Sequence, residues 1–142
     1  MEFSPLIGPI IALVAWTIVM MFWAVIRIQK AIKSGADLSN VPAGARGRDL
    51  EGHIPPRACW PRQNYEHLVE QPTLFYAIVI AIVLMGGDHV VNLYLAWGYV
   101  ALRIGHSLVQ VAGKSRSLFF VTSTLCLMAL TLHAAIEFIS HM

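Results

Sequence analysis

The segment Arg62–Tyr76, RQNYEHLVEQPTLFY, decides the fold of this chain. It begins with polar residues and runs directly into an apolar segment. Helical spacing places His67 and Glu70 on one face. An ionisable side chain inside a bilayer is costly and needs a partner or water. The segment therefore predicts a membrane helix whose polar half faces other polar groups.

The composition around this segment is that of a membrane protein. Hydrophobic residues make up 57% of the 142 residues, and charged residues only 13%. Soluble domains carry about 25% charged residues, so a soluble domain is excluded. The first residues lack the basic region of a secretory signal. Neither Cys59 nor Cys126 has a CxxC or CxxH partner, so no metal site is predicted.

Four segments are expected to form helices of one all-α membrane domain covering residues 1–142. Each is long enough to cross a hydrocarbon core of about 30 Å at about 1.5 Å per residue. Pro72 is expected to kink the second of them. The expected helices are at about 7–28, 64–85, 90–112 and 118–139, with a polar Gly- and Pro-rich loop at 34–61.

The basic residues predict the orientation in the membrane. Seven of the ten Lys and Arg residues lie in or beside the first connection, and Lys114 and Arg116 lie in the third. The tenth, Arg103, lies inside a helix, and the opposite ends carry acidic residues such as Asp88. The positive-inside rule then places both basic connections in the cytoplasm and both termini outside.

Two polar stripes are expected to meet within the cytoplasmic half. Arg103, His106 and Gln110 follow one another at i, i+3 and i+7, which is one face of a helix. Counted from the cytoplasmic end of each helix at about 1.5 Å per residue, Glu70 lies at a depth of about 12 Å and Arg103 at about 16 Å. We therefore expect Glu70 to pair with Arg103, with the histidines nearer the cytoplasm.

Two interpretations of these stripes remain open. A Glu70–Arg103 pair alone could serve only to fix the register of the helices. The full set of polar residues on both stripes predicts a polar pocket open to the cytoplasm, with Asn64, Gln110 and Arg116 around its mouth. Its arginines suit an anionic, water-soluble ligand, and its apolar walls suit a lipophilic one. His133, in the last helix, is expected to be a hydrogen-bonded packing residue.

Two sequence motifs resemble the MAPEG family, the membrane-associated proteins in eicosanoid and glutathione metabolism. They are EQPTLFY at 70–76, and Leu95-Ala96-Trp97 followed by RIGHSL at 103–108. Arg116 opens the fourth helix, as the resemblance requires. The match is closest to the small bacterial members, which implies a bacterial inner membrane.

The resemblance implies a left-handed four-helix bundle that forms a homotrimer among membrane lipids, with glutathione bound between subunits on the cytoplasmic side. It implies that Arg116 stabilises the glutathione thiolate as the catalytic residue. The residues implied to bind glutathione, the co-substrate, are Arg62, Asn64, His67, Glu70, Arg103, His106 and Gln110.

The chain also departs from the family pattern. His67 stands where an asparagine is usual, and Phe119-Phe120 where a tyrosine is expected. The first hypothesis is a glutathione-dependent transferase or peroxidase acting on lipophilic electrophiles, which would enter between the first and fourth helices. The departures motivate a second hypothesis, a non-catalytic lipid-binding or scaffold protein on the same fold.

A third hypothesis, a small transporter or channel subunit, is motivated by the intramembrane ionisable residues. The outer half of the bundle lacks polar residues to continue a path across the membrane. No GxSxG, P-loop or GxGxxG motif supports hydrolase or nucleotide chemistry, and no nucleic-acid partner is expected.

Overall fold

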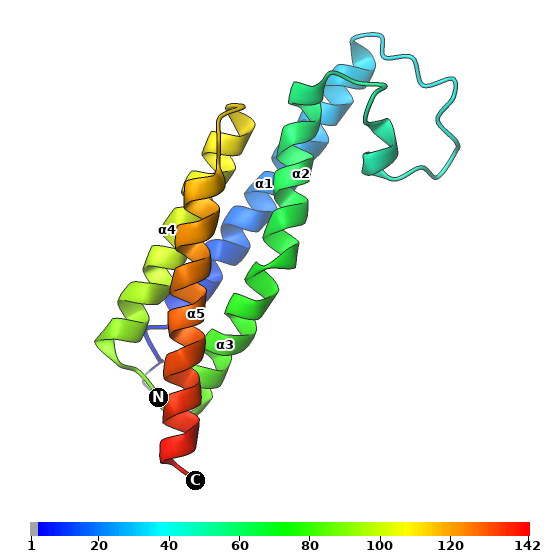
Figure 1. Ribbon diagram of the computed structural model, residues 1–142. Coiled ribbons are helices and arrows are strands. Elements are labelled where there is room, and N and C mark those ends of the chain that lie inside the picture. Colours follow the sequence, from blue (N-terminus) through cyan, green and yellow to red (C-terminus); the bar gives the residue numbers. More distant parts are fainter. Residues whose placement is uncertain (1–2) are drawn as a thin grey trace.

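The computed structural model describes residues 3–142, and its regular structure in that part of the chain is helical. Figure 1 shows α2 and α3 following each other along one column, so that the five long helices form a bundle of four columns. The elements are α1 (Ile7–Lys33), the 3-10 helix η1 (Gly47–Leu50), α2 (Pro56–Glu70), α3 (Pro72–Leu84), α4 (Val90–Val111) and α5 (Ser117–Ser140).

The bundle is built from two helix pairs. α1 packs mainly against α2, and α4 against α5, while contacts of α2 with α4 and of α3 with α5 join the pairs. Both chain ends lie at one end of the bundle, and the connection between α1 and α2 projects beyond the other end (Figure 1). Phe75 and Tyr99 stack in the core with their ring centroids 4.4 Å apart.

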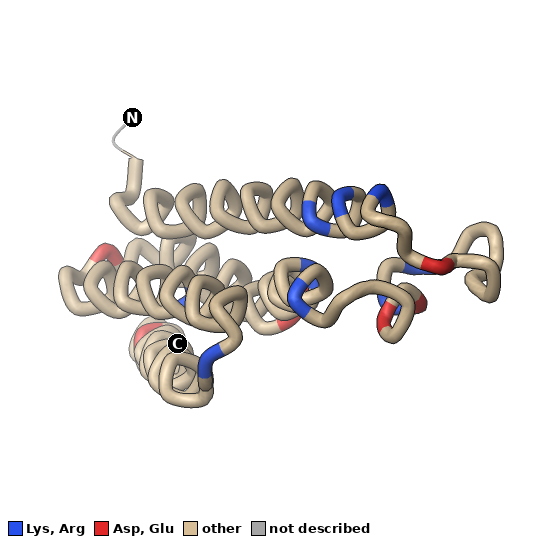
Figure 2. The backbone as a smooth tube through the Cα atoms, turned by 90° about the horizontal axis from the view of Figure 1, so that it is seen from above, with Lys and Arg blue, Asp and Glu red and all other residues tan. Residues whose placement is uncertain are grey.

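Helix length and composition make this an integral membrane protein. α1, the α2–α3 column (Pro56–Leu84) and α5 are each long and apolar enough to cross a membrane. Large apolar side chains such as Phe22, Ile26 and Met128 are exposed on the bundle, as a lipid-facing surface requires. Figure 2 shows basic residues at the end of α1 that joins the projecting loop, where Lys30 and Lys33 lie in the last turn.

Two helices extend further toward the loop than the sequence predicts. α1 continues to Lys33 instead of ending near residue 28, and α2 begins at Pro56 instead of residue 64. Proline is well suited to the first position of a helix, because the N–H that it lacks would have no partner there. The connection is therefore limited to residues 34–55.

Pro61 lies inside α2, and an arginine of α1 compensates for it. Proline has no N–H for the carbonyl four residues earlier, which is that of Arg57. Arg27 Nη2 donates to this carbonyl oxygen at 3.3 Å. The cation thus ties the end of α1 to the first turn of α2.

Pro72 separates α2 from α3, which confirms the predicted interruption. α2 ends at Glu70 and α3 begins at Pro72, with Gln71 between them in helical conformation. The Thr73 hydroxyl donates to the Glu70 carbonyl at 2.6 Å. This bond partly replaces the helical backbone hydrogen bonds that are interrupted at Pro72. The break places Gln71 at the level of the polar stripe on α4.

Two glycines allow the elements around the polar stripe to pack closely. A Cβ at Gly105 of α4 would lie 2.6 Å from the ring of Phe119 on α5. A Cβ at Gly113, which has φ +72°, would lie 2.8 Å from the ring of Trp60 on α2. These close approaches bring α2, α4 and α5 together at one end of the bundle.

Candidate functional site

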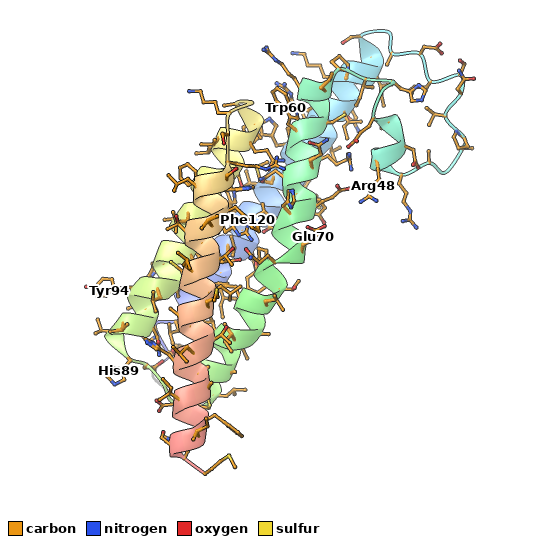
Figure 3. The ribbon with its side chains drawn as sticks, in the orientation of Figure 1. Arg48, Trp60, Glu70, His89, Tyr94 and Phe120 are labelled. Atoms are coloured by element: carbon orange, nitrogen blue, oxygen red, sulfur yellow. The ribbon has the colours of Figure 1, made fainter. Side chains whose placement is uncertain are left out.

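Arg103 is the deepest member of the polar cluster and is only 1% exposed. Its Nε donates to Tyr99 Oη at 3.1 Å, and its Nη2 donates to Gln71 Oε1. The guanidinium also lies 5.4 Å from the ring centroid of Tyr99 and 5.7 Å from that of Phe120. Figure 3 places Phe120 on the side of α5 that faces α2. The cation is therefore surrounded by neutral groups.

The expected Glu70–Arg103 pair is wrong within this chain. Among residues 3–142, the ion pairs involve Arg62 or His67, and none involves Arg103. Successive residues of a helix point about 100° apart, so Gln71 turns toward α4 while Glu70 turns outward. A buried cation without a carboxylate costs several kcal/mol, so this position favours an anionic ligand.

Nearer the loop, α2 and α4 are joined by three buried polar side chains. Asn64 Nδ2 donates to Gln110 Oε1 at 2.9 Å and lies 3.3 Å from His106 Nδ1. The exposed fractions are 0% for Asn64, 2% for His106 and 3% for Gln110. The structure thus places His106 and Gln110 on one buried stripe with Arg103, and Asn64 against that stripe.

Two atoms of this group have no hydrogen-bond partner within the described residues. They are Asn64 Oδ1, an acceptor, and Gln110 Nε2, a donor. An unsatisfied buried polar group costs about 1–3 kcal/mol, so native proteins rarely leave two together. The pair is therefore suited to a ligand that supplies one donor and one acceptor.

A second set of side chains lies at the partly exposed edge where α2 meets α4 and the start of α5. His67 Nδ1 is 3.3 Å from Glu70 Oε2, and His67 Nε2 is 3.5 Å from Arg116 Nη2. The His67 ring meets that of His106 edge to face, with centroids 6.1 Å apart. The side chains of His67 and Glu70 are 39% and 66% exposed. Figure 3 shows Glu70 near the point where α2 gives way to α3.

Arg62 does not join either set. Its guanidinium donates to Glu51 in the loop and to Glu66 one turn along α2. A Cβ at Gly47 would lie 2.6 Å from Arg62 Cδ, so η1 packs directly on this side chain. The geometry gives Arg62 the role of holding the loop against α2, which the sequence did not predict.

Gln71 and Thr124 are site residues that the sequence reasoning missed. Gln71 Nε2 donates to Thr124 Oγ1 at 3.0 Å, while its oxygen accepts from Arg103. An amide directly before Pro72, where the polar half of the segment meets the apolar half, was the signal that could have found it. Both residues line the end of an otherwise mostly apolar groove of about 820 Å³ between α3 and α5.

The comparisons with known proteins agree with this arrangement of helices. The model of the MAPEG family matches residues 6–136, which is nearly the whole chain. No curated protein and no solved structure matched this chain. The match covers all five helices apart from the last turn of α5, and therefore the whole of the polar cluster. The chain therefore belongs to the MAPEG family, a family of membrane proteins associated with glutathione metabolism.

Proposed function

We propose that this protein is a glutathione-dependent transferase or peroxidase that acts on lipophilic electrophiles. The observation that supports this most strongly is the polar cluster of Arg103, Asn64 and Gln110. It combines a buried cation that has no carboxylate partner with an acceptor and a donor that have no partners in residues 3–142. Such a cluster is incomplete without an anionic ligand that also carries amides.

Glutathione fits these groups chemically. It carries two carboxylates, an ammonium group, two amides and a thiol. Arg103 suits a carboxylate, Asn64 Oδ1 suits an amide N–H, and Gln110 Nε2 suits a carbonyl oxygen. Arg116 lies at the rim, where a guanidinium favours the thiolate over the thiol. Arg62 is left out of this proposal because two carboxylates already occupy it.

The proposed active form is a homotrimer with glutathione between neighbouring subunits on the cytoplasmic side. The partial exposure of His67 and Glu70 at this edge of α2 supports a site completed by another copy. Ionisable side chains on a lipid-facing surface would be costly, whereas a subunit interface can hydrate or pair them.

The lipophilic co-substrate is proposed to reach the thiol from the membrane. From the sequence we expect entry between the first and last helices, which are α1 and α5. The groove between α3 and α5 supplies a route with an apolar wall, and it ends at Gln71 and Thr124. Gln71 touches Arg103, so this groove leads to the proposed glutathione site.

Conjugation of glutathione to an aryl halide tests the proposal with the purified protein. Arg116→Ala should lower kcat at least about 100-fold, as removal of one charge-stabilising donor does. Lys114→Ala, in the same exposed turn, is the matched control and should retain activity. Absence of turnover with several electrophiles, together with absence of glutathione binding by calorimetry, would overturn the proposal.

The groove also favours a second candidate function, a non-catalytic lipid-binding protein on the same fold. It is lined largely by apolar side chains such as Leu74, Ile78 and Met128, and it is large enough for an acyl chain. Lipid that co-purifies in this groove, without saturable glutathione turnover, would support this second function over the first.

A further inference from the structure

The three side chains Glu70, His67 and Arg116 form a chain of contacts that the binding role does not require. A carboxylate oxygen lies 3.3 Å from His67 Nδ1, and a guanidinium nitrogen lies 3.5 Å from His67 Nε2. The residues come from two elements, with Glu70 and His67 on α2 and Arg116 at the N-terminal cap of α5. In this arrangement a histidine that could act as a base is oriented by a carboxylate.

The neighbours of His67 determine which of its nitrogens carries the proton. A carboxylate can only accept, so Nδ1 carries the hydrogen and donates to Glu70 Oε2. A guanidinium can only donate, so Nε2 presents its lone pair toward Arg116. The neutral imidazole thus has its basic nitrogen directed at the cation that favours a thiolate.

We propose that His67 is the general base that takes the thiol proton of glutathione, with Glu70 as its positioning residue. This proposal rests on the proposed function. The contact between Arg116 and Nε2 is at the long limit of a hydrogen bond, so a sulfur atom placed beside both groups can replace it. His67 then contacts the reacting atom, and Glu70 acts through His67.

The proton transfer balances in charge and in atoms. The thiol proton moves to His67 Nε2, and the electron pair of the S–H bond stays on sulfur beside Arg116. Two positive groups, the imidazolium and the guanidinium, then face two negative groups, the Glu70 carboxylate and the thiolate. With an aryl halide, the sulfur forms a C–S bond, the carbon–halogen bond breaks, and halide leaves.

The proton can then reach water, because the His67 side chain is 39% exposed. The ionisable groups that face His67 are Glu70 on its own helix, His106 on α4 and Arg116 beside α5. His106 is bonded to Asn64 through Nδ1 and is only 2% exposed, so it is poorly placed to exchange protons with solvent.

The test compares His67→Asn with the wild-type protein across pH. Asparagine can still form hydrogen bonds, so glutathione binding by calorimetry should change less than about threefold, under 1 kcal/mol. At pH 6.5 kcat should fall about 100-fold, which is the usual contribution of general base catalysis. At about pH 9.5 a thiol with a pKa of about 8.5 ionises unaided, and the variant should approach the wild-type rate.

A second readout does not depend on turnover. The ultraviolet absorbance of bound glutathione thiolate, measured near neutral pH, should be lower in His67→Asn than in wild type. Glu70→Gln keeps an acceptor for Nδ1 but loses the charge, so it should give a smaller loss in both measurements. His89→Asn, at the opposite end of the bundle, is the matched control and should leave the pH profile unchanged.

The outcomes separate this proposal from the proposed function. If wild type binds and conjugates glutathione while His67→Asn is slowed equally at every pH, His67 is not the base. A rise in KM with unchanged kcat would likewise leave His67 a binding residue only. Absence of glutathione binding by wild type would overturn both proposals together.

Discussion

The two ends of the bundle differ in whether their buried polar side chains have hydrogen-bond partners. At the end that carries the chain termini, Asn92 Nδ2 donates to the Gly87 carbonyl at 3.1 Å, and His133 Nδ1 donates to Asn92 Oδ1 at 2.7 Å. At the loop end, the unpartnered buried side-chain atoms of residues 3–142 are Arg62 Nε, Asn64 Oδ1 and Gln110 Nε2.

Under the proposed function, the contrast separates structural polar residues from residues that would bind the ligand. The Asn92–His133 pair joins α4 to α5 and closes the α3–α4 turn, so it serves packing and confirms the expected role of His133. The loop-end cluster is connected across helices, but two of its buried atoms, Asn64 Oδ1 and Gln110 Nε2, have no partner within residues 3–142. Substitutions at the two ends should therefore change different properties.

Replacing Arg103 tests the loop end and carries the largest expected effect. Arg103→Met keeps an apolar stem of similar length and removes a buried charge that has neutral partners. Glutathione affinity by calorimetry should fall by about 1.5–3 kcal/mol, the usual value for a hydrogen bond to a charged group. The midpoint of thermal unfolding in detergent should change little, because removal of the buried charge offsets the loss of a partner by Gln71 Oε1 and Tyr99 Oη. A large loss of stability with unchanged affinity would reverse the assignment of the two ends.

Replacing Asn92 tests the opposite end. Asn92→Leu leaves the His133 ring without its partner and removes one of the two donors to the Gly87 carbonyl, which also accepts from the His89 N–H. The free energy of unfolding should therefore fall by about 1–3 kcal/mol. Thermal unfolding measures this fall, and calorimetry should find glutathione affinity unchanged. If Asn92→Leu weakened glutathione binding while leaving stability intact, the end that carries the chain termini would contribute to ligand binding, contrary to the contrast between the two ends.

Replacing Arg62 sharpens the boundary of the site and carries the smallest expected effect. Arg62→Met should cost about 1 kcal/mol or less, because the side chains of its partners Glu51 and Glu66 are 44% and 37% exposed. Release of the loop should make trypsin cleavage after Arg46 and Arg48 faster, with glutathione affinity nearly unchanged. Arg57→Met is the matched control. A large loss of affinity would return Arg62 to the glutathione site.

The helical pattern was readable from the sequence because it depends on neighbouring residues. The apolar segments and the interruption at Pro72 follow from local composition and from the missing proline N–H. The stripe of Arg103, His106 and Gln110 follows from the helical repeat. The structure buries all three side chains, whereas Gln110 was expected at the mouth of an open pocket. The extension of α2 to Pro56 was missed because a Pro- and Gly-rich segment normally indicates a loop.

The partners of the charged residues were not readable, because they depend on how each helix is rotated. Depth along the helix suggested Glu70 as the partner of Arg103, but the rotation of α2 turns the next residue, Gln71, to that position. The loop folds back to bring Glu51 to Arg62, a contact between residues eleven positions apart along the chain.

By itself, the sequence determined that this protein is a helical membrane bundle with a polar stripe in its basic half. Hydrophobicity and periodicity depend on residues that are close in the sequence, so they do not depend on how the helices pack. Only the tertiary structure decided which groups remain without partners and which nitrogen of His67 faces Arg116. Those facts depend on the packing of separate helices, where a rotation by one residue exchanges a carboxylate for an amide.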